Sequence, residues 1–183
     1  MPATTLDANT ALVLIDLQKG ITALPTFSPA ADVVARSAEL AAAFRERGLP
    51  VVLVNVAGGA PGRTQDATRG GELPADWAEL VPELDQRPSD ITVTKQQWGA
   101  FYGTGLDLEL RRRGVTQVVL AGIATSIGVE STARAAHEHG YHVTIATDAV
   151  TDMDADAHRN SIEKIFPRLG EVDSTKAVIG LLG

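Results

Sequence analysis

The chain has 183 residues, of which 44% are hydrophobic and 21% are charged, and its formal net charge is −7. This length and composition are typical of one globular domain with a substantial core, and the acidic charge argues against a nucleic-acid partner or an anionic membrane surface. The absence of cysteine excludes disulfides and thiolate chemistry.

The amino-terminal residues do not resemble a targeting signal. No basic segment precedes the first apolar run, Ala11–Ile15, and that run is far shorter than the roughly 20 residues that a membrane-spanning helix needs. We therefore expect a cytoplasmic protein without a membrane partner, folded as a single domain over residues 1–183.

Five apolar, β-rich runs predict strands. They alternate with helical patterns and are apolar on both faces, which is typical of parallel strands covered by helices on both sides. The expected strands are Ala11–Ile15, Val51–Val56, Ile91–Thr94, Val118–Ala121 and Val143–Ala146.

The segments between the strands predict helices. Three of them end at a glycine that can serve as a C-cap, and a fourth begins in a cluster of acids and is expected to stop before Pro167. The alternation predicts a three-layer α/β fold, in which a doubly wound, open parallel sheet of five to six strands has helices on both faces. The expected helices are Ala31–Arg47, Thr104–Arg113, Val129–His139, Asp154–Phe166 and a short closing helix, Ser174–Leu182.

Residues that follow the strands are the first candidates for a site, because ligands bind outside the carboxyl ends of the strands in such sheets. Asp16 follows the first strand, Lys95 the third, Gly122–Gly128 the fourth and Thr147-Asp148 the fifth. An acid and a lysine at one sheet edge are expected to form either a structural ion pair or a charge pair that tunes acid–base chemistry.

Two loops near this edge have unusual compositions. The segment from Gly58 to Pro88 is long and rich in glycine, proline and charge, and long loops in compact domains usually carry function. Three of the few aromatic residues, Trp98, Phe101 and Tyr102, follow the third strand. They are expected either to form a pocket wall or to cover the sheet edge as ordinary core.

The segment Gly122–Thr132 predicts a strand end, a tight turn and a helix start. Free N–H groups at a helix start can bind an anion or a developing oxyanion, although a plain βα turn looks the same in sequence. The chain contains neither G-x-G-x-x-G nor G-x-x-x-x-G-K-[ST], so nucleotide binding lacks its main support.

A receiver-like signalling domain is another doubly wound possibility. Such a domain needs an acidic pair after strand one, an Asp after strand three and a Lys after strand five. This chain has Asp16 alone, then Lys95, then Thr147-Asp148, so we exclude that interpretation.

Taken together, these residues resemble the isochorismatase-like hydrolases, a superfamily that includes nicotinamidases and carbamoyl-amide hydrolases. The family pattern has an Asp that ends strand one, a Gln two residues later, a Lys that ends strand three and a turn G-x-x-T-x-x-C-V-x-x-T-A after strand four. The phrase FYGTGLDLELRRRGV is also similar to the family. The matching residues are Asp16, Gln18, Lys95, Gly122, Thr125, Val129, Thr132 and Ala133.

One departure from the family pattern decides the implied chemistry. Gly128 occupies the position of the nucleophilic Cys, so the thioester route to amide hydrolysis has no nucleophile. Ser126 lies two residues away, and its side chain is expected to point elsewhere. The resemblance instead implies the chemistry of the true isochorismatases, which have Gly here and cleave a vinyl ether: an acid protonates the vinyl carbon, an oxocarbenium ion forms, and water adds.

The resemblance also implies roles for individual residues. Asp16 is the implied acid, Gly128 leaves free the volume of a Cys side chain and its own N–H, and Lys95 positions Asp16 and meets polar groups of the substrate. Arg63 could pair with a substrate carboxylate, because a guanidinium binds carboxylate bidentately, although a plain surface arginine is commoner. A cis peptide bond is implied at Ile123–Ala124. The remaining candidate substrate contacts are Gln18, Trp98, Phe101, Tyr102, Ala124 and Thr125.

The protonation state of the candidate acid stays open at the level of sequence. A neighbouring Lys95 lowers the pKa of Asp16, which disfavours a general acid at neutral pH. Burial of the carboxyl and a second anion in the substrate would have to oppose this effect.

We expect neither a cofactor nor a metal. The resemblance implies a metal site in nicotinamidases from Asp and His after strand two, but the segment Asn55–Gly62 contains no His. His137 and His139 lie two apart on an expected helix and so do not share a face.

Two functions remain for the chain. One is an isochorismatase-type hydrolase of a small, carboxylate-bearing substrate; the other is a Cys-less relative that binds a ligand or a partner without catalysis. The presence of both Asp16 and Lys95 at strand ends favours catalysis. The family resemblance further implies a homo-oligomer.

Overall fold

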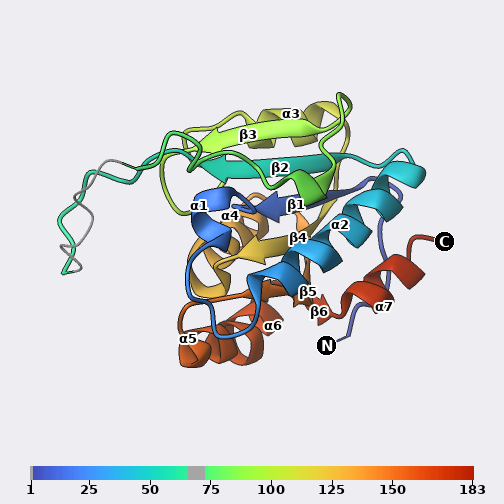
Figure 1. The fold of residues 1–183 in the computed structure, drawn as a ribbon. Helices are drawn as coiled ribbons and strands as arrows, with labels where there is room; N and C mark the ends of the chain where they lie inside the picture. The colour runs from blue at the N-terminus through green and yellow to red at the C-terminus, as the bar shows by residue number, and fades with distance from the viewer. Residues whose placement is uncertain (1, 66–72) are drawn as a thin grey trace.

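The computed structural model describes residues 2–65 and 73–183, and its centre is a six-stranded sheet in the order β3-β2-β1-β4-β5-β6 (Figure 1). Every neighbouring pair of strands is parallel. The predicted doubly wound α/β fold is therefore confirmed. The strands are β1 (Thr10–Ile15), β2 (Val51–Val56), β3 (Ile91–Lys95), β4 (Gln117–Ile123), β5 (His142–Thr151) and β6 (Glu171–Asp173).

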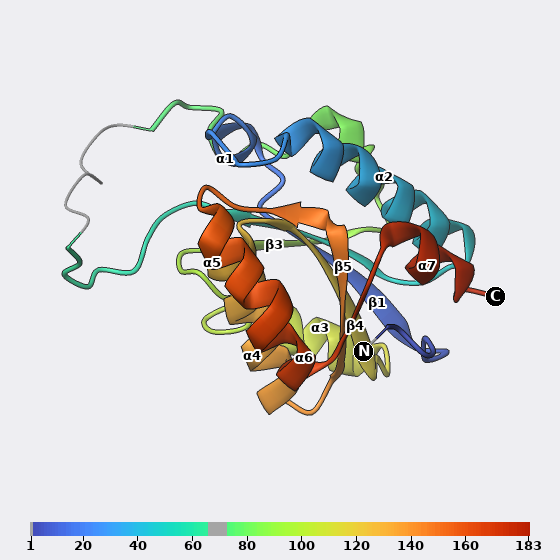
Figure 2. The same cartoon turned by 90° about the horizontal axis from the view of Figure 1, so that it is seen from below.

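Helices cover both faces of the sheet, as Figure 2 shows from below. One face carries α1 (Lys19–Thr22), α2 (Ala30–Glu46) and α7 (Thr175–Gly180). Among the described residues, no helix is both long and apolar enough to cross a membrane. The opposite face carries α3 (Leu106–Arg112), α4 (Glu130–Glu138), α5 (Ala155–Asn160) and α6 (Phe166–Leu169), with the π-helical turns η2 (Thr125–Val129) and η3 (Ser161–Ile165); a 3-10 turn, η1, spans Pro82–Leu84.

The continuous apolar sequence of the central strands follows from burial on both faces. In β1, Val13 and Ile15 point into the core under α3 and α4, whereas Leu12 and Leu14 point into the core under α2. The edge strand β3 differs, because every second residue is exposed. Its alternating sequence matches a strand that is buried on one face only.

The fifth strand is longer than expected, and this changes which residues lie at its carboxyl end. We expected the strand to stop at Ala146, with Thr147-Asp148 at the sheet edge, but β5 continues to Thr151. The register between β4 and β5 shifts beyond Leu120, so the longer strand still pairs with β4. Asp148 instead accepts hydrogen bonds from Thr175, and the residue at the sheet edge is Asp152.

The helical segment after β5 also differs from the expectation that it stops before Pro167. It passes through the π-helical turn η3 and continues as α6, in which Pro167 lies in the first turn. The first turn of an α-helix is the position at which proline is tolerated best.

The strand order reverses between β1 and β4. The chain proceeds from β1 outward to β2 and β3, and then returns to build β4, β5 and β6 on the other side. Gly122 of β4 packs so closely on β1 that a Cβ there would lie 2.1 Å from the Ile15 carbonyl oxygen, and its φ is +124°. Only glycine fits these two demands. The carboxyl ends of β1 and β4 therefore form the switch point at which ligands bind in such sheets.

Candidate active site

Asp16 follows β1 at this switch point and adopts a φ of 53°, in the left-handed region that Asp tolerates better than most residues. Its N–H donates to the Val54 carbonyl oxygen at 2.9 Å, which ties the residue to β2. The residue is only 5% exposed. Within the described residues, its Oδ1 is buried and accepts no hydrogen bond, so one carboxyl oxygen is left without a partner.

Lys95 ends β3 and reaches across β2 to this carboxyl group. Its Nζ lies 2.7 Å from Asp16 Oδ2 and donates to the Gln97 carbonyl oxygen at 3.1 Å. The residue is 2% exposed. The expected charge pair is therefore formed, and it is buried. Of the three protons on the ammonium, two have acceptors among the described residues.

The sequence left open whether burial or Lys95 has the larger effect on the pKa of Asp16, and in the structure burial has the larger effect. Desolvation raises the pKa of Asp16 from its ordinary value of 3.8 to about 6, although the charge and hydrogen bond of Lys95 pull the pKa down. Burial wins because a carboxylate loses more by leaving water than this single cation returns. At neutral pH, roughly a tenth of the molecules then carry a protonated Asp16, which is enough for a general acid.

The turn η2 brings the backbone of Gly128 against the same carboxyl group. A Cβ on Gly128 would lie 3.3 Å from Asp16 Oδ2, 3.5 Å from the Trp98 carbonyl oxygen and 2.9 Å from Ile15 Cγ2. The last distance is too short for a normal contact, so a side chain here would force Ile15 to move. The absence of a side chain leaves two oxygen acceptors facing one small space.

The turn is not the tight turn that we expected, and three of its N–H groups bear on the open question whether such groups are free to bind an anion. It is a π-helical turn, and the N–H of Ser126 donates to Asp152 Oδ2 at 2.7 Å. The N–H groups of Ile127 and Val129 both donate to the Ala124 carbonyl oxygen at 3.1 Å. These three donors are therefore engaged within the protein and do not point freely at a ligand. The implied cis peptide bond between residues 123 and 124 is present.

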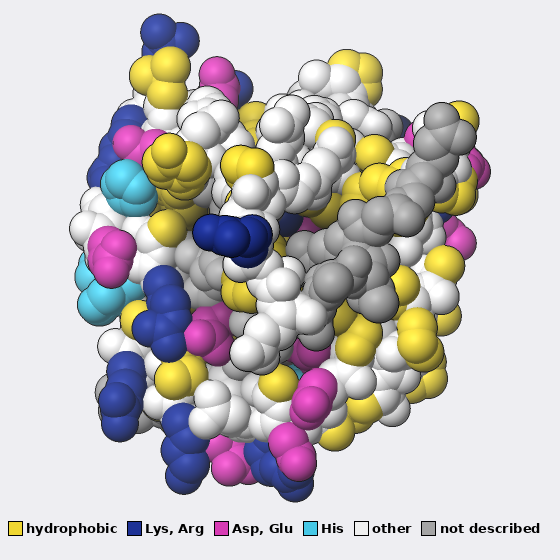
Figure 3. All heavy atoms as spheres, turned by 90° about the vertical axis from the view of Figure 1, so that its left-hand side faces the viewer, with side chains coloured by type: hydrophobic (Ala, Val, Ile, Leu, Met, Phe, Trp, Pro, Cys, Tyr) yellow, Lys and Arg dark blue, Asp and Glu magenta, His cyan; other side chains and the backbone are white. Residues whose placement is uncertain are grey.

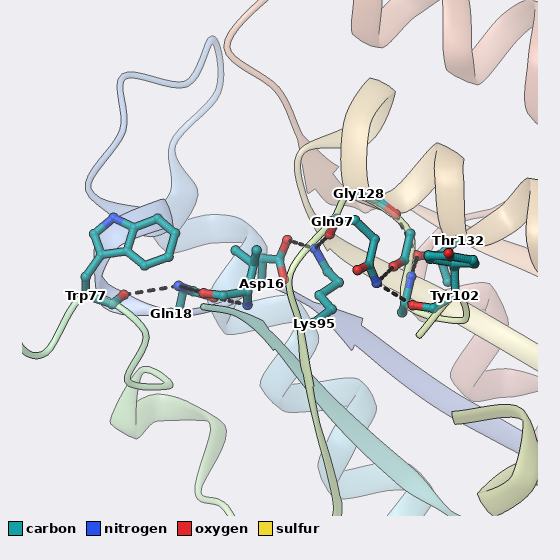
Figure 4. A network of polar contacts seen from close by, with 11 residues as sticks. Asp16, Gln18, Trp77, Lys95, Gln97, Tyr102, Gly128 and Thr132 are labelled. Carbon is teal, nitrogen blue, oxygen red and sulfur yellow. Dashed lines mark hydrogen bonds and ion pairs between the residues drawn. The ribbon is translucent and has the colours of Figure 1, made fainter. Parts of the chain in front are cut away.

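The loop after β3 is connected to the turn by side chains, as Figure 4 shows. Gln97 Nε2 donates to the carbonyl oxygens of Gly99 and Tyr102. Thr132 Oγ1 accepts from the N–H of Ala100 at 3.1 Å and donates to the Gly128 carbonyl oxygen at 2.7 Å. The lysine loop and the Gly128 turn are thus held together as one unit.

The three aromatic residues of this loop have different environments. Trp98 and Tyr102 are 52% and 83% exposed. Phe101 is buried in the core, where its ring packs on His139 at 5.1 Å and Tyr141 at 5.9 Å. Of the two roles that the sequence left open for Phe101, the structure therefore shows the core position.

The side-chain amide of Gln18 also forms its hydrogen bonds within the protein. Its Oε1 accepts from the Val56 N–H at 2.7 Å, and its Nε2 donates to the carbonyl oxygens of Val56 and Trp77 at 3.0 and 3.1 Å. Both amide protons are used, so Gln18 has no donor left for a substrate. Its role is to fasten the segment around Trp77 to the ends of β1 and β2; a Cβ on Gly20 would collide with the Trp77 ring.

Of the other expected substrate contacts, Ala124 is buried, and Thr125 and Arg63 lie in opposite environments. Thr125 is fully buried, and its Oγ1 pairs with His158 Nδ1 at 2.8 Å. Arg63 belongs to the segment 57–65, which is exposed throughout and projects from the body of the molecule (Figures 1 and 2). Residues 66–72 of the same loop lie outside the described residues.

Asn55, in β2, has a partner at each end of its side-chain amide. Its Nδ2 donates to the Ala78 carbonyl oxygen and its Oδ1 accepts from Thr94 Oγ1. In the part of the chain that the structure describes, no three His, Cys, Asp or Glu side chains lie close enough together to hold a metal ion.

Sequence reasoning missed two residues next to the turn, Asp152 and His158. Asp152 lies beyond Ala146, the expected end of the fifth strand; the apolar pair Ala149-Val150 is the signal that the strand continues. His158 lies inside the expected helix Asp154–Phe166. Nothing in its local sequence shows that it meets a threonine 33 positions away.

Figure 3 views the molecule from the carboxyl ends of the strands, the side on which Asp16 and η2 lie. Hydrophobic side chains there are interspersed with basic and acidic ones, and Lys and Arg lie mainly toward the left of the view. The mixed surface agrees with a small polar ligand better than with a large apolar one.

Comparisons with known proteins agree with this geometry. Residues 10–177 match the model of the Isochorismatase domain. The chain is 47% identical over 175 residues to the uncharacterized isochorismatase family protein YwoC of Bacillus subtilis, covering 92% of this chain and 91% of that protein. A ureidoacrylate amidohydrolase of Methylobacterium radiotolerans is 30% identical over 207 residues, covering 96% and 80%.

A solved structure has the same fold as this chain. The isochorismatase family protein from Burkholderia thailandensis superimposes with a TM-score of 0.93 at 46% sequence identity, and the match covers 97% of each chain.

Proposed function

This chain belongs to the isochorismatase family of hydrolases, and we propose that it cleaves a vinyl ether in a small, carboxylate-bearing substrate by general acid catalysis. The observation that carries the proposal is the buried Asp16 carboxyl, whose pKa is raised to about 6 beside Lys95. A general acid works best when its pKa lies near the operating pH.

The reaction uses Asp16 as proton donor and acceptor. Asp16 gives its proton to the terminal vinyl carbon; the C=C electron pair forms the new C–H bond, and the ether oxygen stabilises the cation as an oxocarbenium ion. Water adds to the cationic carbon and returns a proton to Asp16. The hemiketal then breaks its C–O bond, which releases an alcohol and a keto acid.

Lys95 helps at the moment of proton transfer. When Asp16 loses its proton, the carboxylate that forms lies 2.7 Å from the ammonium and is stabilised by it. The same carboxylate faces the oxocarbenium ion, whose positive charge it stabilises in turn. Both effects grow as charge develops, so they lower the barrier more than they strengthen substrate binding.

Gly128 supports this chemistry over amide hydrolysis. It stands at the position of the nucleophilic Cys in the family pattern, and the chain has no cysteine at all. The volume that a side chain would fill is bordered by Asp16 Oδ2 and the Trp98 carbonyl oxygen. A water molecule next to this volume can donate to both acceptors, which suits the water that attacks the cation.

The second candidate is a family member that binds its ligand without turnover. The missing nucleophile favours it, because the amidohydrolases among its relatives have an activity that this site has no thiol to perform. Against it, a binder gains nothing from a buried carboxyl whose pKa is raised, since burying a charge pair is costly for stability.

The test is a turnover screen with isochorismate, other enolpyruvyl ethers and a panel of small amides that includes ureidoacrylate. We expect release of the keto acid from a vinyl ether, no ammonia from the amides, and no substrate-derived adduct on Ser126 or Thr125 by mass spectrometry. Ammonia release would overturn the proposal in favour of an amidase, and inactivity toward every vinyl ether would favour the binder.

A further inference from the structure

The turn that brings Gly128 to Asp16 is held from outside by two side chains that the proposed chemistry does not use. Asp152, which follows β5 and is 2% exposed, accepts the Ser126 N–H at 2.7 Å. His158 on α5 pairs through Nδ1 with the buried Thr125 hydroxyl at 2.8 Å. Two consecutive residues of the turn are thus fixed from a separate part of the fold.

These two side chains are themselves held in place. Asp152 Oδ1 accepts from the Asp154 N–H at 3.3 Å, and the Asp152 carbonyl oxygen accepts from the Phe27 N–H at 2.9 Å. The Phe27 ring packs against the His158 ring, with 4.7 Å between ring centroids. Asp154 caps the first turn of α5 by accepting from the N–H groups of residues 156 and 157. The histidine therefore has little freedom to move.

The turn needs such support because its functional residue cannot support itself. Gly128 has no side chain that packing could lock, and glycine has the greatest backbone freedom of all residues. On the inner side, its carbonyl oxygen accepts a hydrogen bond from Thr132. On the outer side, the hydrogen bonds of Ser126 to Asp152 and of Thr125 to His158 hold the turn in place, which a side chain on Gly128 cannot do.

We propose that His158 and Asp152 are positioning residues that hold the Thr125–Gly128 turn against the Asp16 carboxyl group. The effect on turnover rests on the proposed function, whereas the effect on the surroundings of Asp16 does not. If the turn loosens, water reaches a carboxyl that the turn backbone now covers. Desolvation is the main cause of the raised pKa of Asp16, so that pKa should then fall toward its ordinary value.

Two substitutions of His158 separate positioning from simple packing. His158→Phe keeps an aromatic ring against Phe27 but removes the hydrogen bond to Thr125, whereas His158→Asn removes the ring but keeps a polar group at the level of Nδ1. A packing role predicts that the Phe variant is the better tolerated of the two. A positioning role predicts the opposite order.

The readouts are the pKa of Asp16, followed by NMR of its carboxyl carbon, and kcat and KM on the vinyl ether. We expect His158→Phe to lower the pKa of Asp16 and to reduce kcat about tenfold to hundredfold, with a smaller change in KM. In His158→Asn, the pKa of Asp16 and kcat should both stay close to their wild-type values. His142→Asn, at the exposed amino end of β5, is the matched control and should leave both unchanged.

Thr125→Val provides an independent arm, because it is nearly isosteric and removes only the hydroxyl. It should reproduce His158→Phe, and the double variant should be no worse than either single one, since both delete the same hydrogen bond. The proposal is overturned if the Asp16 pKa and kcat are unchanged in both single variants, or if their effects simply add. If the wild-type protein turns over no vinyl ether, the proposed function fails, while the NMR titration still decides whether the turn is positioned in this way.

Discussion

Two sides of the candidate site lie at the same edge of the sheet but differ sharply in burial. The closed side consists of Asp16, Lys95 and the turn η2, and its acid and base are almost fully buried. The open side consists of Trp98, Tyr102 and the segment 57–65, all of which are exposed or half-exposed. On the closed side, polar groups are held by hydrogen bonds from β2, β3, α4 and α5.

We expect the closed side and the open side to have different functions. A proton donor needs a low-dielectric environment and a fixed geometry, and both require the support of several elements. Substrate recognition tolerates exposed side chains on loops, where a change of residue costs little stability. We therefore expect changes on the closed side to alter turnover and folding, and changes on the open side to alter affinity.

The largest effect should come from Asp16→Asn, which keeps the size of the side chain and removes its transferable proton. Turnover should fall by roughly 10²–10⁴, because the lost interaction belongs to the transition state. The dissociation constant for a non-hydrolysable analogue should change much less. The measurement is keto-acid release beside calorimetric binding, and wild-type activity in this variant would remove Asp16 from the mechanism.

Loss of Lys95 should cause a large loss of stability. Lys95→Met leaves a buried carboxyl without its partner and should cost about 3–5 kcal/mol of unfolding free energy at pH 7. The loss should shrink at pH 5, where Asp16 is protonated, and in the double variant with Asp16→Asn. Urea unfolding measures the stability of Lys95→Met at pH 7, of the same variant at pH 5, and of the double variant.

A second lysine provides the control for this prediction. Lys19 pairs with Asp76 and Glu79 at the surface, where water screens the pair, so Lys19→Met should cost far less stability than Lys95→Met. An equal cost for the two lysine variants would contradict the importance of burial.

The pH dependence of stability should also identify the closed side. The folded-state pKa of Asp16, about 6, lies above its ordinary value of 3.8, so the folded protein keeps a proton that the unfolded chain releases. The stability that this contributes is fully present below about pH 4 and is lost as the pH rises through 6. Relative to Asp16→Asn, the wild type should lose about 3 kcal/mol over that range. A constant difference between the two proteins in urea unfolding would show that the pKa is not raised.

Gly128→Ala should affect both folding and turnover, to a smaller extent. The added methyl group meets Ile15 at 2.9 Å and fills the space beside Asp16 Oδ2, so we expect a cost of about 1–3 kcal/mol and slower turnover. Gly105→Ala, outside the candidate site, is the matched control, because nothing lies within 4 Å of a Cβ there and its φ is −87°. Unchanged kcat in Gly128→Ala would mean that this space is not used in the reaction.

The smallest effects on stability should come from the open side. Tyr102→Ala and Arg63→Gln should each change the unfolding free energy by less than about 0.5 kcal/mol while raising KM for a carboxylate substrate. Phe101→Ala, one residue from Tyr102, should instead cost about 3–5 kcal/mol because it empties a core position. If Arg63→Gln leaves KM unchanged, the arginine is a plain surface residue.

Several elements could be predicted from sequence because their signal is local. The apolar runs that end at Asp16, Val56 and Lys95 identify parallel strands and the edge at which their carboxyl ends meet. The end of β5 could not be found in this way, because the strand continues past Asp148 only by pairing with β4 after a register shift. The same error concealed Asp152.

Sequence was also unable to predict the environments of the candidate substrate contacts. Gln18 and Thr125 match the family pattern, yet their polar groups are used by partners distant in the chain, Trp77 and His158. Phe101 and Tyr102 are adjacent aromatics, and only packing distinguishes the buried ring from the exposed one. Residue type and spacing do not contain this information.

The sequence by itself determined the fold class, the strand edge that carries the site, the presence of an acid and a lysine there, and the absence of a thiol nucleophile. Only the tertiary structure decided that Asp16 is a carboxyl with a pKa of about 6 and not a permanently charged partner of Lys95. The physical reason is that desolvation depends on everything that surrounds a group. For Asp16, those surroundings come from β2, β3 and the turn after β4, which are far apart in the chain and meet only when it folds.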